Sequence, residues 1–74
     1  MTCEKINTAI GQQIALRRRE LKMSLANLST ECGVTLQQVH KYETGQSLVS
    51  AAMLAQLSRC LDVPVVYFFR SLSR

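Results

Sequence analysis

Several features on which enzymes and metal-binding proteins depend are scarce in this sequence. It contains one His, no Trp and only five acidic residues, and its three Cys are widely separated. It has no glycine-rich phosphate loop and no paired carboxylates beside an apolar stretch, so no catalytic constellation or metal-ligand cluster can be assembled. We therefore expect no enzymatic activity, no metal and no cofactor.

The sequence also lacks the apolar segments that define membrane and secreted proteins. No apolar run is long enough to span a bilayer, and the first ten residues contain no apolar signal region. Cys3, Cys32 and Cys60 are odd in number, and Cys32 and Cys60 fall on apolar helix faces. Both are therefore predicted to be small core residues in a reducing cytoplasm, and we expect no membrane partner.

The remaining composition predicts one compact, basic domain. The chain has 74 residues, of which 47% are hydrophobic and 19% charged, which suits a single small core rather than a disordered tail. Its formal net charge is +4 and its pI is near 9.4. A positive balance of this size favours a polyanionic partner without establishing one.

The stretch from Met23 to Gly45 predicts two short helices joined by a tight turn. Ser24 and Thr35 are favourable N-cap residues, because a hydroxyl can accept a hydrogen bond from a free N–H of the first turn. Gly33 lies where a left-handed residue would end the first of these helices. Two caps, a glycine turn and two helices of about eight residues form a helix-turn-helix unit.

The second of these helices, residues 36–43, carries the functional prediction. At about 100° per residue, with Val39 pointing inward, Glu43 and Tyr42 lie on the inward side and Leu36 lies at its edge. The outward side carries no carboxylate, and its amides and lysine can bond to base edges in the DNA major groove. We predict that these outward residues read bases: Gln37, Gln38, His40 and Lys41.

Most of the chain, from about Ile10 to Phe69, resembles the Cro/repressor (XRE-type) helix-turn-helix regulators. The resemblance lies in the order of IGQQIALRRRELKMS, the turn ECGVT, QQVHKYETG, and LVSAAMLAQLSRCLDVPVVYFF, and it is closest to a bacterial subgroup with a QQV-x-KYE-x-G stretch. It implies an all-α, five-helix DNA-binding domain that regulates transcription. It also implies that Arg18 pairs with Glu43 and locks the first helix to the recognition helix.

The helices outside this unit follow from apolar spacing. We predict a mobile N-terminal arm over residues 1–7 and a single domain over residues 8–72. The first helix should cover residues 8–21, with Ile10, Ile14 and Leu21 turned inward. A helix over residues 51–61, capped by Ser50, should bury Leu54, Leu57 and Leu61. Residues 65 to about 72 should form one or two further helical turns.

Contacts to the DNA backbone are predicted around the helix-turn-helix unit. For Arg17 and Arg19 a solvated helix face and a phosphate contact are both open, and Arg17 is included among the backbone candidates. Ser47-Leu48 stands where the subgroup usually has Asn-Arg, and Leu25 stands where a Gln is common, so phosphate binding should be weakened. The predicted backbone residues are Ser24, Thr35, Thr44, Gln46, Ser47 and Arg17.

The apolar segment Val65–Phe69 predicts a homodimer. Five apolar residues on one short helix cannot all enter so small a core, so we expect Val65, Val66, Phe68 and Phe69 to contact a second copy, in keeping with the family. The alternative is that both Phe residues fill the core and only the Val edge is exposed. A dimer would read an inverted repeat in double-stranded DNA.

A second function remains open. Leu25 and Leu48 place apolar side chains where a DNA-binding surface should be polar, which favours a repressor-fold interaction module, such as an antitoxin-like or accessory partner. Because no effector segment follows the DNA-binding unit in this sequence, we expect no small-molecule ligand. We expect the protein to be cytoplasmic and associated with the nucleoid.

Overall fold

The computed structural model describes residues 2–72, and all regular structure within them is helical. The elements are α1 (Cys3–Glu20), α2 (Leu25–Cys32), α3 (Leu36–Thr44), α4 (Ala51–Leu61) and a 3₁₀-helix, η1 (Val65–Leu72). These five helices, with no strand among the described residues, confirm the predicted all-α, five-helix architecture.

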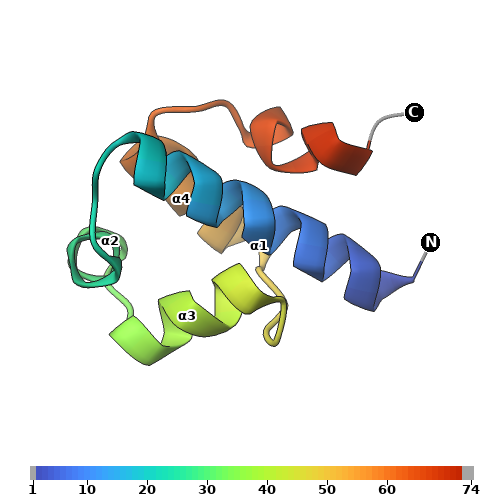
Figure 1. The fold of residues 1–74 in the computed structure, drawn as a ribbon, viewed down its shortest axis with the longest axis horizontal. Coiled ribbons are helices and arrows are strands. Elements are labelled where there is room, and N and C mark those ends of the chain that lie inside the picture. The colour runs from blue at the N-terminus through green and yellow to red at the C-terminus, as the bar shows by residue number, and fades with distance from the viewer. Residues whose placement is uncertain (1, 73–74) are drawn as a thin grey trace.

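Helix α1 is the central element of the fold. It packs against α3 on one side and against η1 on the other, and α4 crosses behind it (Figure 1). Helix α2 lies near the C-terminal end of α1 and packs against α3 and α4. The helix-turn-helix unit, α2 and α3, is therefore held in place by α1, which packs against α3, and by α4, which packs against α2.

The core takes side chains from every helix. Ile10 and Ile14 are buried as predicted, whereas Leu21 is 38% exposed and was wrongly placed inside. Leu21 is the C-cap residue of α1, which ends at Glu20, so helical spacing no longer sets its direction. The largest fully buried side chains are Phe68, Ile14, Leu28, Leu57, Leu61 and Val39.

Helix α1 begins earlier than predicted. The Thr2 hydroxyl accepts a hydrogen bond from the N–H of Lys5, and the helix starts at Cys3 instead of Thr8. Thr2 is a good N-cap, and Glu4 in the first turn interacts favourably with the positive end of the helix dipole. Residues 3–7, predicted to be an arm, are thus part of α1, and Met1 lies outside the described residues.

The predicted caps are confirmed. Ser24 accepts a hydrogen bond from the N–H of Asn27 at 2.9 Å, and the Asn27 side chain accepts one from the N–H of Ser24 at 3.0 Å. Gly33 takes the left-handed conformation, with φ of 73°, and so turns the chain from α2 toward α3. Thr35 and Ser50 cap α3 and α4. These caps fix where both helices of the unit begin.

The C-terminal apolar segment is helical, as predicted, but its side chains divide between core and surface. Phe68 is fully buried, so the prediction that it contacts a second copy is wrong. Phe69 is partly buried against the core, and Val65 and Val66 are exposed. The alternative in which a Val edge stays exposed is thus close to the observed arrangement.

Candidate nucleic-acid interface

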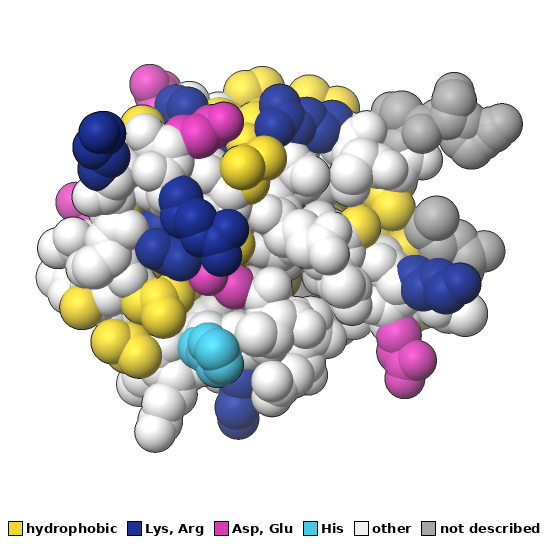
Figure 2. Space-filling model, in the orientation of Figure 1, with side chains coloured by type: hydrophobic (Ala, Val, Ile, Leu, Met, Phe, Trp, Pro, Cys, Tyr) yellow, Lys and Arg dark blue, Asp and Glu magenta, His cyan; other side chains and the backbone are white. Residues whose placement is uncertain are grey.

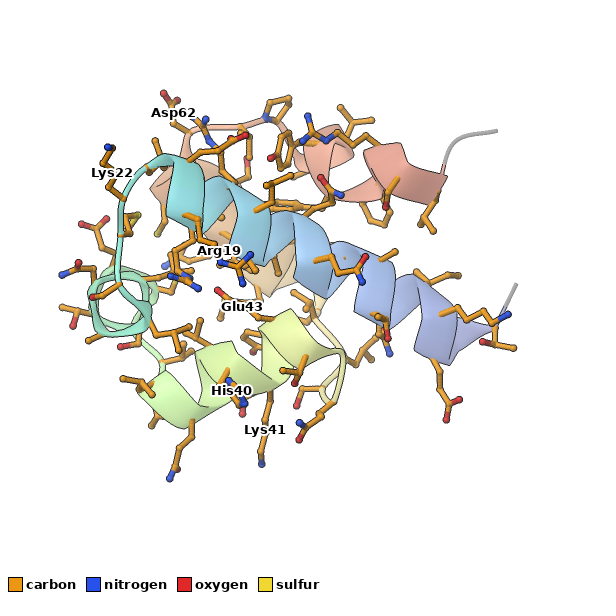
Figure 3. The ribbon with its side chains drawn as sticks, viewed as in Figure 1. Arg19, Lys22, His40, Lys41, Glu43 and Asp62 are labelled. Carbon is orange, nitrogen blue, oxygen red and sulfur yellow. The ribbon has the colours of Figure 1, made fainter. Side chains whose placement is uncertain are left out.

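One side of helix α3 is apolar and faces the core, and the opposite side is polar and faces solvent. Val39 and Tyr42 are buried in the core, whereas Gln37, His40 and Lys41 are exposed. Figure 3 shows Glu43 pointing from α3 toward α1, while Lys41 points away from α1. The helical-wheel prediction for these residues therefore agrees with the structure. We call Gln37, His40 and Lys41 the outer strip of α3.

The outer strip carries no negative charge, because the only carboxylate of α3 is turned inward. Arg18 donates to Glu43 through Nε at 2.6 Å and through Nη2 at 3.1 Å, and the side chains are 12% and 8% exposed. Arg18 Nη1 also donates to the carbonyl of Met23 at 2.9 Å. The predicted pair is present, and it joins α1, α3 and the segment that precedes α2.

Basic side chains lie near the outer strip. Figure 2 shows His40 at the surface, with a Lys or Arg side chain below it and a Lys/Arg cluster above it, and with part of an acidic side chain between that cluster and His40. Arg19 is exposed on α1, and Figure 3 shows it on the same face as His40. A solvated residue and a phosphate contact are both predicted as possible for Arg19, and its side chain is accessible for either role.

Gln38 lies at the flank of the outer strip. It is half-buried, and its Nε2 donates to the hydroxyl of Ser47 at 3.2 Å. The predicted base contact Gln38 and the predicted backbone contact Ser47 therefore lie side by side, Gln38 in α3 and Ser47 in the loop that follows α3. The N–H groups of Gln46 and Ser47 bond to the carbonyl of Lys41, at 2.9 Å and 3.3 Å. Side chains, more than backbone N–H groups, are therefore what this loop can offer to a ligand.

Two predicted backbone residues keep a hydrogen-bond donor available. Ser24 and Thr35 use their hydroxyl oxygens as acceptors for the N–H groups of Asn27 and Gln38. A hydroxyl has one proton to donate in addition to its acceptor positions, so each can still donate to a phosphate oxygen. Both lie at the start of a helix, where the dipole favours an anion.

Two other backbone candidates are engaged elsewhere. Arg17 Nε donates to the carbonyl of Leu61 at 2.9 Å, and its Nη1 donates to Glu20 at 3.3 Å. Arg17 thus satisfies the C-terminal end of α4, where carbonyls lack helical partners, and its assignment to DNA is corrected. The Thr44 hydroxyl donates to the carbonyl of His40 at 3.0 Å, so its only proton is used within α3.

Leu25 and Leu48, the two apolar residues that depart from the family pattern, differ in how exposed their side chains are. Leu25 is partly buried and packs against the core, so it is not simply an apolar side chain on a binding surface. Leu48 is 74% exposed in the loop before α4. Only Leu48 therefore keeps the property that suggested a protein partner.

One residue that positions the interface, Gly11, is not among the residues predicted from the sequence. A Cβ at Gly11 of α1 would lie only 2.7 Å from the carbonyl oxygen of Glu43, so glycine lets α1 and α3 approach closely. The signal was a glycine inside a helix, where it is less favourable than alanine by about 1 kcal/mol.

Within residues 2–72 no group of three or more His, Cys, Asp or Glu side chains could hold a metal ion. No single helix of this region is long and apolar enough to cross a membrane. Only α4 and η1 taken together pass on length and composition, and they are bent by 104°.

The two capped helices, the left-handed Gly33 turn and the exposed strip on the second helix define a helix-turn-helix domain. The family model described as "Helix-turn-helix" (HTH_3) matches residues 14–68. The chain belongs to this family of DNA-binding regulators, and the predicted XRE-type resemblance is confirmed. Its members are regulators of transcription and not enzymes.

Related sequences carry matching descriptions. The chain is 36% identical over 73 residues to an uncharacterized transcriptional regulator in the ATPase CF(0) region of Rhodospirillum rubrum, covering 99% of this chain and 68% of that protein. It is 44% identical over 64 residues to an uncharacterized HTH-type transcriptional regulator of Sinorhizobium medicae, covering 86% of this chain and 46% of that one. The chain thus spans about two thirds of the first relative's length and about half of the second's.

Solved structures share the fold. The restriction-modification controller protein C.AhdI of Aeromonas hydrophila superposes with a TM-score of 0.80 at 26% identity, covering 84% of this chain and 94% of that chain. An HTH_3 family transcriptional regulator of Vibrio cholerae gives a TM-score of 0.86 at 23% identity, covering 95% of this chain and 39% of that chain. At that identity the second match supports the fold alone.

Proposed function

We propose that this protein binds double-stranded DNA sequence-specifically and regulates transcription, with α3 in the major groove. The observation that carries the proposal is the outer strip: Gln37, His40 and Lys41 are exposed together, and Glu43 is withdrawn into its pair with Arg18. A helix of this kind meets DNA without a carboxylate facing the phosphates. The names of the relatives as transcriptional regulators support the same role.

The side chains of the outer strip match base edges in the groove. Gln37 can donate and accept in a bidentate contact with adenine, and Lys41 can donate to guanine N7 and O6. His40 adds a further donor or acceptor one residue before Lys41. Gln38 joins this set at its edge, beside Ser47. Each good bidentate pair contributes about 1–3 kcal/mol of discrimination against the wrong base.

Backbone contacts set affinity and register. We assign them to the hydroxyls of Ser24 and Thr35, the side chains of Gln46 and Ser47, and the exposed guanidinium of Arg19. Arg19 replaces Arg17 in this set, because the Arg17 guanidinium is bound to the Leu61 carbonyl and to Glu20. With few cations near the phosphates, binding should be weak for a single domain and only moderately dependent on salt.

We further propose that the protein acts as a homodimer in the cytoplasm, at the nucleoid, and reads an inverted repeat. The apolar edge of Val65 and Val66, with Phe69 beside it, supplies the two-fold contact, since Val66 is 69% exposed. Two recognition helices on one face of DNA contact major grooves about 34 Å apart, so half-site centres should be about ten base pairs apart. Joining two weak half-site contacts raises the apparent affinity greatly.

One observation favours a second function, a protein-interaction module with weakened DNA binding. Leu48 stands 74% exposed in the loop that follows the recognition helix, where a partner protein could cover it. The polar outer strip and the withdrawn Glu43 favour DNA over this alternative.

A gel-shift titration separates the two functions. The protein is mixed with sheared bacterial genomic DNA at low salt, bound fragments are sequenced, and a duplex carrying the enriched sequence is compared with a scrambled duplex of equal length. We expect enrichment of an inverted repeat and tighter binding to it than to the scrambled duplex. Binding to neither duplex, or equal binding to both, would reject sequence-specific recognition.

A further inference from the structure

Two thiols from different helices meet beside the helix-turn-helix unit. Cys32 ends α2 and Cys60 lies in α4, and their sulfur atoms are 3.5 Å apart, close enough for the Cys32 thiol to donate to the Cys60 sulfur. Cys32 is buried, Cys60 is half-buried, and both are free thiols. The third cysteine, Cys3, is exposed in the first turn of α1. Neither the outer strip nor the Val65–Val66 edge includes these sulfur atoms.

The two sulfur atoms are in non-bonded contact. A disulfide has sulfur atoms about 2.05 Å apart, so the two thiols need to approach by about 1.5 Å more. Their positions are 28 residues apart in the sequence, so the contact depends on α2 packing against α4. The folded state thus brings together two groups that would rarely meet in an unfolded chain.

We propose that Cys32 and Cys60 form an oxidisable dithiol, which a hydroperoxide converts into an intramolecular disulfide. The Cys60 thiolate attacks a peroxide oxygen, the O–O bond breaks, and Cys60 becomes a sulfenic acid while hydroxide leaves as water. The Cys32 sulfur then attacks the Cys60 sulfur, the S–O bond breaks, and a second water leaves. Two thiols and one hydrogen peroxide give one disulfide and two waters.

The surroundings assign the order of these steps. Cys60 is the more accessible of the two sulfurs, so it meets the oxidant first. Burial and the contact with Cys60 raise the pKa of the Cys32 thiol from 9.0 to about 12, which keeps Cys32 protonated until its partner is oxidised. The direct approach of Cys32 to Cys60, rather than a high thiolate fraction, is what drives closure.

The cross-link ties α2 to α4 and leaves the outer strip of α3 untouched. Because it restricts the unfolded chain, the oxidised protein should melt at a higher temperature than the reduced protein. DNA binding should persist in both states.

The test uses the full chain with Cys3→Ser, which removes the exposed thiol. After treatment with hydrogen peroxide, intact-mass spectrometry should show a loss of 2 Da, peptide mapping should locate a Cys32–Cys60 link, and dithiothreitol should reverse both. Adding Cys60→Ala, or separately Cys32→Ser, should abolish the loss of 2 Da. Circular dichroism checks that each variant is folded, and the half-buried Cys60 site is the less disruptive of the two to change.

Oxidation of the folded protein to sulfinic acid without loss of 2 Da would overturn the proposal, as would an unchanged mass. Disulfide-linked dimers in place of the intramolecular link would also overturn it.

A different observation carries a second inference, which rests on the proposed function. Leu36 is the first residue of α3, directly after the Thr35 cap, and it is 46% exposed one helical turn before His40. The N-terminal residues of a recognition helix contact base edges, and the apolar feature of the major groove is the C5-methyl group of thymine. We infer that Leu36 contacts a thymine methyl and so adds to sequence discrimination.

Replacing the thymines of the enriched duplex by uracil, one at a time, removes single methyl groups. At one position of each half-site the protein should lose about fourfold in affinity, the equivalent of one methylene-sized apolar contact. Leu36→Ala should bind the thymine and uracil duplexes equally at that position, whereas Leu48→Ala should still discriminate. Discrimination retained by Leu36→Ala would reject the contact. A protein that fails to prefer the enriched duplex over a scrambled one would instead reject the proposed function.

Discussion

Arg18 of α1 and Glu43 of α3 hold each other through two hydrogen bonds, at 2.6 Å and 3.1 Å, with both side chains nearly buried. The pair has two consequences. It fixes the recognition helix to the central helix, and it removes the only carboxylate of α3 from the outer strip. The same contact therefore sets both the position and the charge of the proposed DNA-binding surface.

Breaking the pair should destabilise the fold strongly. Glu43→Ala leaves the Arg18 guanidinium buried with one backbone carbonyl as its remaining partner, and the free energy of unfolding should fall by about 3–5 kcal/mol. Urea denaturation followed by circular dichroism measures the change. The control is Glu20→Ala, which breaks the exposed Arg17–Glu20 pair and should change stability by less than about 1 kcal/mol. An equal loss of unfolding free energy in Glu43→Ala and Glu20→Ala would show that the Arg18–Glu43 pair is no more important to stability than the exposed Arg17–Glu20 pair.

Gly11 offers a test of how closely α1 and α3 approach. In an isolated helix Gly11→Ala should be stabilising by about 1 kcal/mol. Here the new Cβ would lie 2.7 Å from the Glu43 carbonyl oxygen, so the helices must separate, and we expect a net loss of about 1–3 kcal/mol. Gln12→Ala, on the exposed side of the same turn, should have little effect. Thermal unfolding of the two variants gives the comparison, and a more stable Gly11→Ala protein would contradict the observed packing.

Local chemistry explains which parts of the fold could be predicted from the sequence. Ser24, Gly33, Thr35 and Ser50 act on backbone groups within a few residues, so their roles were readable without tertiary contacts. The orientation of α3 could be predicted as well, since placing Val39 in the core sets the direction of every other side chain on the helix. The predicted start of the first helix at residue 8 is too late, because the helix is capped by Thr2 and begins at Cys3.

Contacts between distant segments could not be predicted from residue patterns. The partner of Arg17 is a carbonyl 44 positions away, at the end of α4, and no spacing rule indicates it. The division of the last segment, with Phe68 inside and Val66 outside, depends on how η1 lies against α1. The inward direction of Glu43 could be predicted from the helical wheel, whereas its pairing with Arg18 was taken from the family resemblance.

The thiol of Cys32 should make stability depend on alkaline pH. Its pKa is raised by burial to about 12 in the folded protein, against 9.0 as the ordinary value, so folding favours the protonated form. The contribution is fully present below about pH 9 and is lost as the pH rises from 9 toward 12, because only the unfolded chain releases the proton in that window. Urea denaturation at pH 8 and pH 10.5 should show a decline that is smaller in Cys32→Ala. An equal decline in both proteins would contradict the raised pKa.

The proposed dimer can be tested at Val66. This side chain is 69% exposed, so Val66→Glu should leave the domain folded while placing a charge in the contact. Sedimentation should show a dimer for the wild-type protein and a monomer for the variant. Affinity for the full inverted repeat should fall by at least tenfold, with little change for a single half-site.

Ala55→Glu places the same charge on an exposed position of α4 and should leave the dimer intact. Phe69→Glu is the less useful variant, because Phe69 also packs against the core. A Val66→Glu protein that remains dimeric would remove this edge from the interface.

The ratio of affinities for the enriched duplex and for a scrambled duplex tests the outer strip most directly. Gln37→Ala and Lys41→Ala should each lower this ratio by about five- to 150-fold, the equivalent of 1–3 kcal/mol per base contact. Gln46→Ala, which removes a proposed backbone contact and touches no base-reading side chain, should weaken binding to both duplexes and leave the ratio unchanged. If Gln37→Ala and Lys41→Ala also leave the ratio unchanged, α3 does not read the sequence through its outer strip.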